Sequence, residues 1–234
     1  MDFSKIIVLI PTLNEAKNLS ILIPELFRRL PGISVLIVDD RSTDGTAPLL
    51  AELQRMFPRL SYIIRQGEKG YGRACLEGFH WAQARPFEAI VTMDADFSHD
   101  FNAIPGLAAH LPEYDVVIGS RYIPGGAIAN WHRHRRLLSR FANWYVGFIL
   151  QIPTRDVTTG FNAYAASALR TIDLNGIAAD GYAFLVELKY RLWQKRCRFV
   201  EHPITFSERR EGQSKMSSRV IWESIWLPWK LRLY

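Results

Sequence analysis

An apolar segment that ends in two carboxylates limits the fold of this chain more than any other feature. Residues 89–93 form a short run rich in β-branched side chains, which is typical of a buried strand. Asp94 and Asp96 follow it, and alternate residues of an extended backbone point the same way. Ligands of open α/β sheets bind beyond the carboxyl ends of the strands. The pair therefore indicates either a site for a hard divalent cation, which takes oxygen ligands, or a solvated turn rich in Asp.

Similar short apolar runs alternate with segments of helical periodicity throughout the first half of the chain. We expect strands over residues 5–10, 34–38, 60–64, 89–93 and 115–119. We expect helices between them, ending near residues 29, 56, 84 and 111. This alternation predicts an α/β fold with a mostly parallel, doubly wound sheet flanked by helices. A chain of 234 residues is long enough for one such core.

Polar residues stand where the first two expected strands end. The motif Pro11-Thr-Leu-Asn-Glu15 follows the first strand, and Asn14 is suited to cap the next helix. Asp39 and Asp40 end the second strand, as turn and cap residues or, for one of them, as a partner of a nucleobase or ribose. The Gly-rich turn of a dinucleotide-binding fold is missing after the first strand, which argues against a nicotinamide enzyme.

The second half of the chain contains an aromatic helix and an aromatic tail. We expect a helix over residues 133–150 with a basic start and an apolar stripe that includes Phe141, Trp144 and Phe148. Such a helix either lies in a membrane surface or packs on the sheet with its Arg residues in solvent. Residues 216–234 hold three Trp among basic residues, a pattern that favours a membrane interface and supports the first interpretation.

Two other segments of the second half allow two interpretations each. Glu187, on a helix expected over residues 182–196, is either a buried functional carboxylate or a structural partner of Arg191. The polar residues 206–215 form either a solvated loop or a lid. In a lid, the side chains of Arg209 and Lys215 would clamp phosphates.

Composition and charge narrow the class of protein. Hydrophobic residues make up 48% of the chain and charged residues 22%, which is a globular composition. The net charge of +6 favours anionic partners. Two Cys do not make a disulfide framework and suggest a reducing compartment. We expect neither a spanning helix nor a signal peptide, because no apolar run is long enough and the first residues lack the pattern.

Five motifs follow one another between residues 6 and 215. They are Pro11-Thr-Leu-Asn-Glu15, Val38-Asp-Asp40-Arg-Ser-Thr-Asp44-Gly45, Asp94-Ala-Asp96, Gly119-Ser-Arg121-Tyr122, and Phe206 to Lys215 with its Gly-Gln-Ser-Lys end. Together these motifs resemble the family-2 glycosyltransferases of GT-A fold. More narrowly, they are similar to the dolichol-phosphate (polyprenol-phosphate) mannose synthases, a branch favoured by residues 121–139 and by the Gly-Gln-Ser-Lys loop.

The resemblance implies an inverting transfer of mannose from GDP-mannose to a polyprenyl monophosphate, with a β-linked product and Mg²⁺ or Mn²⁺ as cofactor. It implies one catalytic domain over residues 1–215, with a nucleotide-sugar-binding half (1–119) and an acceptor-binding half (120–215). An amphipathic, membrane-associated tail (216–234) would follow. The protein would be peripheral, at the cytoplasmic face of a membrane, with a membrane-anchoring subunit as a candidate partner.

The resemblance also assigns roles to individual residues. Catalysis falls to Asp96, Arg121 and Arg209. The metal would be held by Asp94, Asp96 and Ser98, and the acceptor phosphate by Arg121, Arg135 and Ser139. Residues expected to contact the nucleotide sugar are Pro11, Leu13, Glu15, Val38, Asp40, Asp94, Ala95, Asp96, Arg121, Arg209 and Lys215.

Two positions depart from the pattern of the family. Leu13 stands where the family usually has Tyr, so we expect contacts to the base that differ from the usual ones, and Ser98 stands where the family often has a Gln metal ligand. Three alternatives stay open at this point. The first is a related transferase that uses UDP-glucose or another sugar nucleotide, and the second is a non-catalytic membrane scaffold. The third is a nucleic-acid-binding module, suggested by the basic residues 133–136, although we expect no nucleic acid partner.

Overall fold

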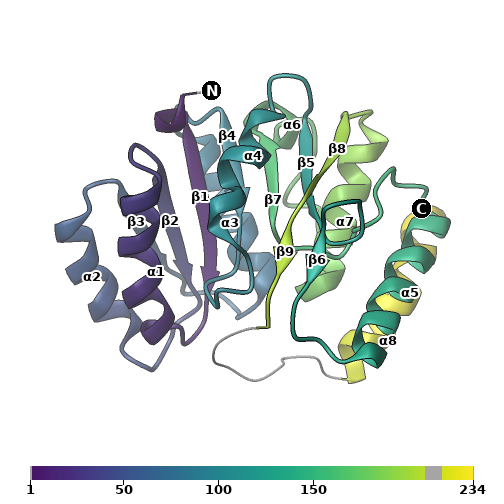
Figure 1. The fold of residues 1–234 in the computed structure, drawn as a ribbon, viewed down its shortest axis with the longest axis horizontal. Helices are drawn as coiled ribbons and strands as arrows, with labels where there is room; N and C mark the ends of the chain where they lie inside the picture. The colour runs from purple at the N-terminus through teal and green to yellow at the C-terminus, as the bar shows by residue number, and fades with distance from the viewer. Residues whose placement is uncertain (1, 209–217, 234) are drawn as a thin grey trace.

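A computed structural model describes residues 2–208 and 218–233, and its centre is a seven-stranded sheet in the order β3-β2-β1-β4-β7-β5-β8 (Figure 1). The strands are β1 (Ile6–Thr12), β2 (Ser34–Asp39), β3 (Leu60–Ile64), β4 (Ala89–Thr92), β5 (Val116–Ser120), β7 (Asn162–Ala165) and β8 (Phe199–Pro203). Strand β7 is antiparallel to its neighbours β4 and β5, and the other pairs are parallel. The prediction of a mostly parallel sheet is confirmed.

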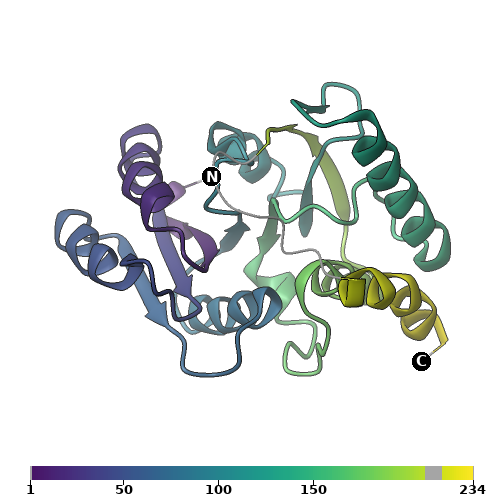
Figure 2. The same ribbon diagram turned by 90° about the horizontal axis from the view of Figure 1, so that it is seen from below.

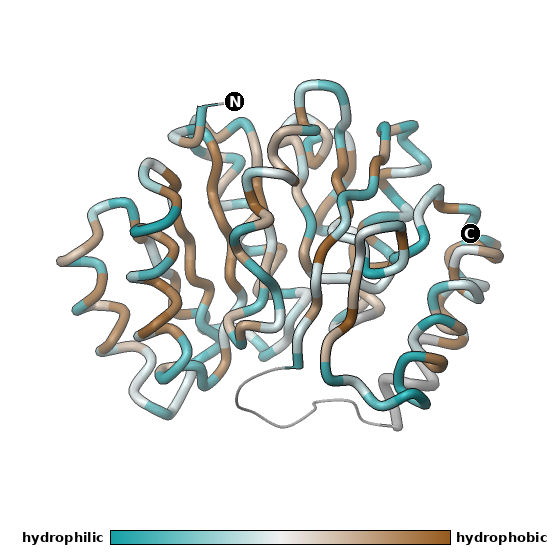
Figure 3. The backbone as a smooth tube through the Cα atoms, viewed as in Figure 1, coloured by the Kyte–Doolittle hydropathy of each residue, from teal (hydrophilic) through white to brown (hydrophobic). Residues whose placement is uncertain are grey.

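Helices cover both faces of the sheet. Helices α1 (Ala16–Arg29), α2 (Thr46–Met56) and α4 (Ile104–Ala109), which follows the short 3₁₀ turn η2 (Phe101–Ala103), pack on one face. Helices α3 (Tyr71–Gln83), α6 (Ala166–Leu169) and α7 (Gly181–Gln194) pack on the other. Alternate side chains of each strand enter opposite cores, and Figure 3 shows the hydrophobic colour concentrated along the strands.

The face of β1 illustrates how the sequence produces these two cores. Ile6, Val8 and Ile10 join the core beneath α1 and α2, whereas Ile7 and Leu9 join the core beneath α3 and α7. All five side chains are buried, so the strand reads as a continuous apolar run rather than as an alternating one. The register of the parallel strands then carries the polar residues after each run to one edge.

Two helices lie beside the sheet at its β8 end, as Figures 1 and 2 show from two directions. Helix α5 (Arg133–Leu150) spans the range predicted from the sequence, and α8 (Ser218–Leu233) packs along it. Val146 and Ile149 of α5 share a third core with Leu227 and Leu231 of α8. In the described part of the chain, no helix combines the length and the apolar character that crossing a bilayer requires.

Smaller elements complete the fold. The turn η1 (Phe3–Lys5) precedes β1, and the two short strands β6 (Ala127–Ile128) and β9 (Thr205–Phe206) pair in parallel outside the main sheet. Helix α7 carries Glu187, which binds Arg191 and the amide N–H of Ala179. These contacts support the structural interpretation of Glu187.

The expected capping role of Asn14 is wrong. Helix α1 has Glu15 at its N-cap position, and Asn14 adopts a positive φ of 58° in the turn before it. Its side-chain oxygen accepts a hydrogen bond from the amide of Thr43, and Asp44 accepts one from the amide of Ala16. The first turn of α1 is therefore capped from the neighbouring loop, because the two loops lie against each other at the sheet edge.

Candidate active site

The carboxyl ends of β1, β2, β4 and β5 meet at one edge of the sheet, which Figure 2 views from below. Strands β1, β2 and β4 are parallel, and β5 has the same direction because β7 is antiparallel to both β4 and β5. The loops with Asp40, Asp96 and Arg121 thus leave the sheet on one side. This arrangement gathers the polar motifs of the sequence at a position where α/β folds bind ligands.

The two carboxylates at the end of β2 are held by the protein. Asp39 accepts hydrogen bonds from the amide and the hydroxyl group of Ser42. Asp40 accepts one from the buried guanidinium of Arg65 and one from the amide of Gly70. Both carboxylates therefore shape the loops around them, and a contact of Asp40 with a base or ribose stays a prediction.

The two carboxylates after β4 differ in exposure. The side chain of Asp94 is 37% exposed, whereas Asp96 is buried and accepts a hydrogen bond of 3.0 Å from the amide of Ser98. Phe97, which follows Asp96, has a positive φ of 61°, which turns the chain sharply. The turn holds one carboxylate open to ligands and the second one fixed beneath the surface.

His99 supports this turn from below. Its Nδ1 atom accepts a hydrogen bond of 3.1 Å from the amide of Asp94, so a neutral ring carries its proton on Nε2. The ring is buried and stacks on Phe161 at 5.0 Å between centroids, with Phe206 at its edge. Burial lowers the pKa of His99 to about 4, although Asp96 acts in the opposite direction. His99 is thus a neutral hydrogen-bond acceptor near pH 7 and positions the backbone of Asp94.

The donor set of this turn fits a hard divalent cation that shares its ligands with a substrate. Two carboxylates, of Asp94 and Asp96, stand one residue apart, and the buried hydroxyl oxygen of Ser98 has no hydrogen-bond partner among the described residues. Among residues 2–208 and 218–233, no cluster of three or more His, Cys, Asp or Glu side chains is suited to hold a metal ion by itself. Mg²⁺ commonly takes one or two carboxylates and completes its shell with water and phosphate oxygens.

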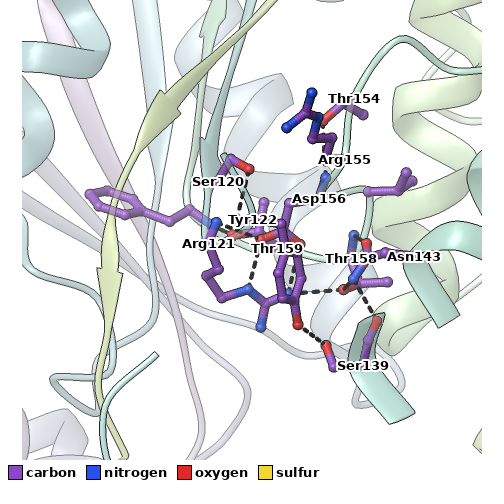
Figure 4. A network of polar contacts seen from close by, with 12 residues as sticks. Ser120, Arg121, Tyr122, Ser139, Asn143, Thr154, Arg155, Asp156, Thr158 and Thr159 are labelled. Atoms are coloured by element: carbon purple, nitrogen blue, oxygen red, sulfur yellow. Dashed lines mark hydrogen bonds and ion pairs between the residues drawn. The ribbon is translucent and has the colours of Figure 1, made fainter. Parts of the chain in front are cut away.

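Arg121, which follows β5, is bound tightly to Asp156 (Figure 4). Its Nε and Nη2 atoms each lie 2.7 Å from a different oxygen of the Asp156 carboxylate, and its amide donates to the same carboxylate at 3.0 Å. Thr158 accepts a further hydrogen bond from Nη2. Both ionic side chains are buried, so this bidentate pair fixes the direction of the guanidinium.

Lys189 holds the segment that carries Asp156. Its ammonium group, on α7, donates hydrogen bonds to the carbonyl oxygens of Val157 at 2.7 Å and of Thr159 at 2.8 Å. The side chain is fully buried, and this burial lowers its pKa to about 7, against the opposing effect of the Asp156 charge. Helix α7 therefore sets the position of the Arg121 guanidinium through two intermediate contacts.

The three residues predicted to bind the acceptor phosphate lie around two aromatic rings. The hydroxyl of Tyr122 lies 2.7 Å from the hydroxyl of Ser139. Trp131 has the guanidinium of Arg121 at 5.7 Å and that of Arg135 at 4.0 Å from its ring centre. The structure thus brings Arg121, Arg135 and Ser139 into one cluster.

The remaining predicted residues differ in how far the structure describes them. Pro11 and Val38 lie in β1 and β2, and Ala95 is buried between the two carboxylates. Leu13 is half-buried after β1, and Glu15 accepts a hydrogen bond from the side chain of Asn18. Arg209 and Lys215 lie outside the described residues.

Four residues that shape the site had no predicted role. Arg65, Asp156 and Lys189 act through partners at least 25 positions away, so no local pattern marks them. His99 stands three residues after Asp96, and this place within the acidic motif was the one local signal that could have marked it. A buried cation on a helix, such as Lys189, gives no such signal.

Residues 7–173 match the family model described as glycosyl transferase family 2. The chain is 37% identical over 221 residues to the undecaprenyl-phosphate mannosyltransferase of Micrococcus luteus, covering 94% of this chain and 91% of that protein. It is 39% identical over 221 residues to the polyprenol monophosphomannose synthase of Mycolicibacterium smegmatis, covering 94% and 83%. It is 36% identical to the dolichol-phosphate mannosyltransferase of Pyrococcus furiosus, of which it spans 62%.

Solved structures share the fold at low sequence identity. Glucosyl-3-phosphoglycerate synthase of Mycobacterium tuberculosis, crystallised with Mg²⁺ and UDP, superposes with a TM-score of 0.65 at 16% identity. The match covers 96% of this chain and 79% of the other. A second structure of that synthase, with Mn²⁺, UDP and phosphoglyceric acid, gives a TM-score of 0.67. These matches agree with the expected GT-A fold.

Proposed function

Because the chain belongs to glycosyl transferase family 2, we propose that it transfers mannose from GDP-mannose to a polyprenyl monophosphate, with inversion at the anomeric carbon. The observation that carries the proposal is the shared sheet edge, where an acidic turn and a cluster of arginines and aromatic rings lie on the same side. The names of three relatives, at 36–39% identity, support the mannosyl group and the lipid phosphate.

The acidic turn would bind the donor. Asp94 and Asp96, with Ser98 and the backbone of Ala95, would hold a Mg²⁺ or Mn²⁺ ion against the diphosphate. When bound, the ion neutralises charge that grows on the departing diphosphate. Other residues would contact the base, ribose and phosphates, namely Pro11, Leu13, Glu15, Val38, Asp40, Arg209 and Lys215.

The basic cluster would bind the acceptor. A phosphate monoester is mostly a dianion near neutral pH, because its second pKa is about 6, so the attacking oxygen needs no general base. Arg121, Arg135 and Ser139 would hold this phosphate in line with the anomeric carbon, which is a proximity effect. Attack by the phosphate oxygen forms the new glycosidic bond as the bond to GDP breaks. A single displacement of this kind turns an α-linked donor into a β-linked product.

We place the protein at the cytoplasmic face of a membrane, and exposed aromatic side chains support its peripheral attachment there. Phe141, Trp144 and Phe148 on α5 are 58%, 62% and 70% exposed, and Trp226 on α8 is 65% exposed. Aromatic rings on the open side of amphipathic helices favour the boundary between head groups and acyl chains. We place the donor-binding half at residues 1–119, the acceptor-binding half at 120–215 and the membrane-associated tail at 216–234. An anchoring subunit is a candidate partner.

A transfer assay tests the proposal. The purified chain is incubated with GDP-mannose, UDP-glucose or another sugar nucleotide, and with a short or a long polyprenyl phosphate, with Mg²⁺, with Mn²⁺ or with EDTA. We expect transfer from GDP-mannose, loss of transfer in EDTA, and a β-anomeric lipid phosphate by NMR. Preferred use of a UDP-sugar would replace the donor, and an α-linked product would contradict the inverting mechanism.

A further inference from the structure

A groove of about 460 Å³ runs along the flank of α5 that faces away from α8. It is formed by one stripe of the helix together with residues after β5 and after α5. The residues that matter here are Tyr122, Arg140, Trp144, Gly147, Phe148 and Ile152. Its volume lies within the range of roughly 300–1,000 Å³ typical of ligand pockets. Of these residues, Trp144 and Phe148 were assigned above to the membrane surface, and the groove itself has no role so far.

The groove begins at the cluster proposed to bind the acceptor phosphate. Tyr122 belongs to both, because its hydroxyl contacts Ser139 and its ring lines the groove. The guanidinium of Arg140 lies 5.9 Å from the centre of that ring. Ser139 does not line the groove itself, but its hydrogen-bond partner Tyr122 does, so the phosphate cluster and the groove meet at this residue.

The groove ends among the exposed aromatic side chains of α5. Trp144 and Phe148, whose rings stack at 5.8 Å, line it and are also more than 60% exposed. Ile152, which is buried, lines it from the segment that follows the helix. The groove therefore leads from a polar cluster to the surface proposed to meet the membrane, and its far part is lined by aromatic and aliphatic side chains together with Thr154 and Arg155.

Gly147 gives the groove its width. A Cβ atom built on this residue would meet only the carbonyl oxygen of Thr154, at 4.0 Å. Gly147 lies eight residues beyond Ser139, which is about 12 Å along a helix. A side chain at position 147 would thus project into space that the protein leaves open, without moving the backbone.

We propose that this groove binds the isoprenoid chain of the acceptor beyond its phosphate group. The inference rests on the proposed function, because it takes the phosphate to lie at Arg121, Arg135 and Ser139. Apolar burial supplies the binding energy of such a chain, which has no polar atoms to pair. Arg140 and Arg155, both exposed, frame the groove with polar heads while their aliphatic stems cover apolar surface.

A graded series at Gly147 tests the groove. Two acceptors, with two and with eleven isoprene units, are compared in the same detergent micelles, and the ratio of kcat/KM for the long over the short acceptor is measured. We expect Gly147→Leu to lower this ratio by about tenfold or more, because it blocks the path of the longer chain. Gly147→Ala adds one methyl group to open space and should lower the ratio by less than about threefold.

A second pair of variants controls for folding and for membrane contact. Trp144→Ala removes an exposed wall of the groove, and Phe141→Ala removes an equally exposed ring outside it. Trp144→Ala should lower the chain-length ratio, and Phe141→Ala should leave it at the wild-type value. Circular dichroism monitors the fold of each variant. If Gly147→Leu does not fold, the Trp144 and Phe141 pair decides the question.

Three outcomes would overturn the inference. A ratio that stays at the wild-type value in both Gly147→Leu and Trp144→Ala shows that the chain binds elsewhere. If that unchanged ratio comes with weaker flotation on phosphatidylglycerol vesicles, the groove binds a phospholipid instead. If the wild-type chain transfers sugar to neither acceptor, the proposed function itself fails and the inference falls with it.

Discussion

The acidic turn after β4 and the basic cluster after β5 lie at the same sheet edge but are built differently. Asp96 is positioned by Ser98, two residues away, and Asp39 by Ser42, three residues away. Arg121, in contrast, is positioned by Asp156, 35 residues away. The acidic turn is thus held by contacts within its own loop, whereas the basic cluster is a set of buried contacts between distant segments. Asp40, also on the donor side, is built like the basic cluster, because distant Arg65 and Gly70 hold it.

Because of this difference, we expect mutations in the two regions to affect different properties, stability in one and chemistry in the other. The Asp96 carboxylate accepts a hydrogen bond from an amide of its own loop, which an uncharged amide oxygen at this position can also do, so loss of its charge should affect chemistry more than folding. Each member of the buried pair Arg121–Asp156 neutralises the other, so removal of one leaves the second charge stranded. We expect the buried Arg121–Asp156 pair to contribute mainly to stability and the acidic turn after β4 mainly to chemistry.

The largest expected effect on stability tests the buried pair. Asp156→Ala leaves the buried guanidinium of Arg121 without its carboxylate, which should lower the free energy of unfolding by about 3–5 kcal/mol. Urea denaturation at low temperature measures it. The control is Arg198→Ala, which removes a partly exposed partner of Asp115 and should cost about 0–1 kcal/mol. Equal losses of unfolding free energy in the two variants would contradict the expected importance of the buried pair.

The largest expected effect on activity tests the acidic turn. Asp96→Asn keeps the oxygen that accepts from Ser98 but removes the charge, so the fold should persist. We expect kcat to fall by roughly 10²–10³-fold, the loss typical when one group that stabilises developing charge is removed. Asp100→Asn, in the same loop and exposed, is the matched control and should retain activity. Near-normal turnover by Asp96→Asn would contradict the metal role.

The buried Lys189 allows a test by pH. Its pKa is about 7 in the folded protein and near 10.5 when unfolded, so between these values the unfolded state binds more protons. Stability should therefore rise with pH across this window, by up to about 1.4 kcal/mol per pH unit. Lys189→Met lacks this titration, so the free energy of unfolding of wild type should increase relative to that of the variant as pH rises from 7 to 10.

The control for this titration is a variant of Lys195, the residue that directly follows the same helix. Lys195 is exposed after α7, so Lys195→Met should differ from wild type by an amount that does not change with pH. A constant difference between wild type and Lys189→Met would show that Lys189 keeps an ordinary pKa. Water would then reach the Lys189 ammonium group more readily than its buried contacts indicate.

The same contrast explains what the sequence could predict. The ranges of β3 and α5 and the end of α2 were predicted correctly, because apolar periodicity and β-branched runs are local signals. The acidic turn after β4 was also recognisable, since both carboxylates belong to one short motif. The insertion of β7 between β4 and β5 was not predicted, because register with distant strands leaves no local mark.

The partners of Arg121 and Arg135 were hidden for the same reason. Both arginines were recognised from the motifs around them, but neither Asp156 nor Trp131 could be paired with them before the fold was known. Asn14 was misjudged in a related way, since its preference for helix caps competes with its tolerance of a positive φ. The neighbouring loop decides between the two, and that loop is brought near only by the sheet.

The smallest expected effect concerns Glu208, a partner of the acceptor cluster that a bound phosphate should replace. Arg135 lies 3.5 Å from Glu208, and their side chains are 38% and 50% exposed, so this pair contributes only about 0–1 kcal/mol to stability. A phosphate at Arg135 would compete with the Glu208 carboxylate. Glu208→Gln should therefore lower the KM for the acceptor by less than about fivefold and leave the KM for the sugar nucleotide unchanged. Glu113→Gln, an exposed change of equal charge after α4, should alter neither value, and a higher acceptor KM in Glu208→Gln would mean that Glu208 helps to hold Arg135 in place.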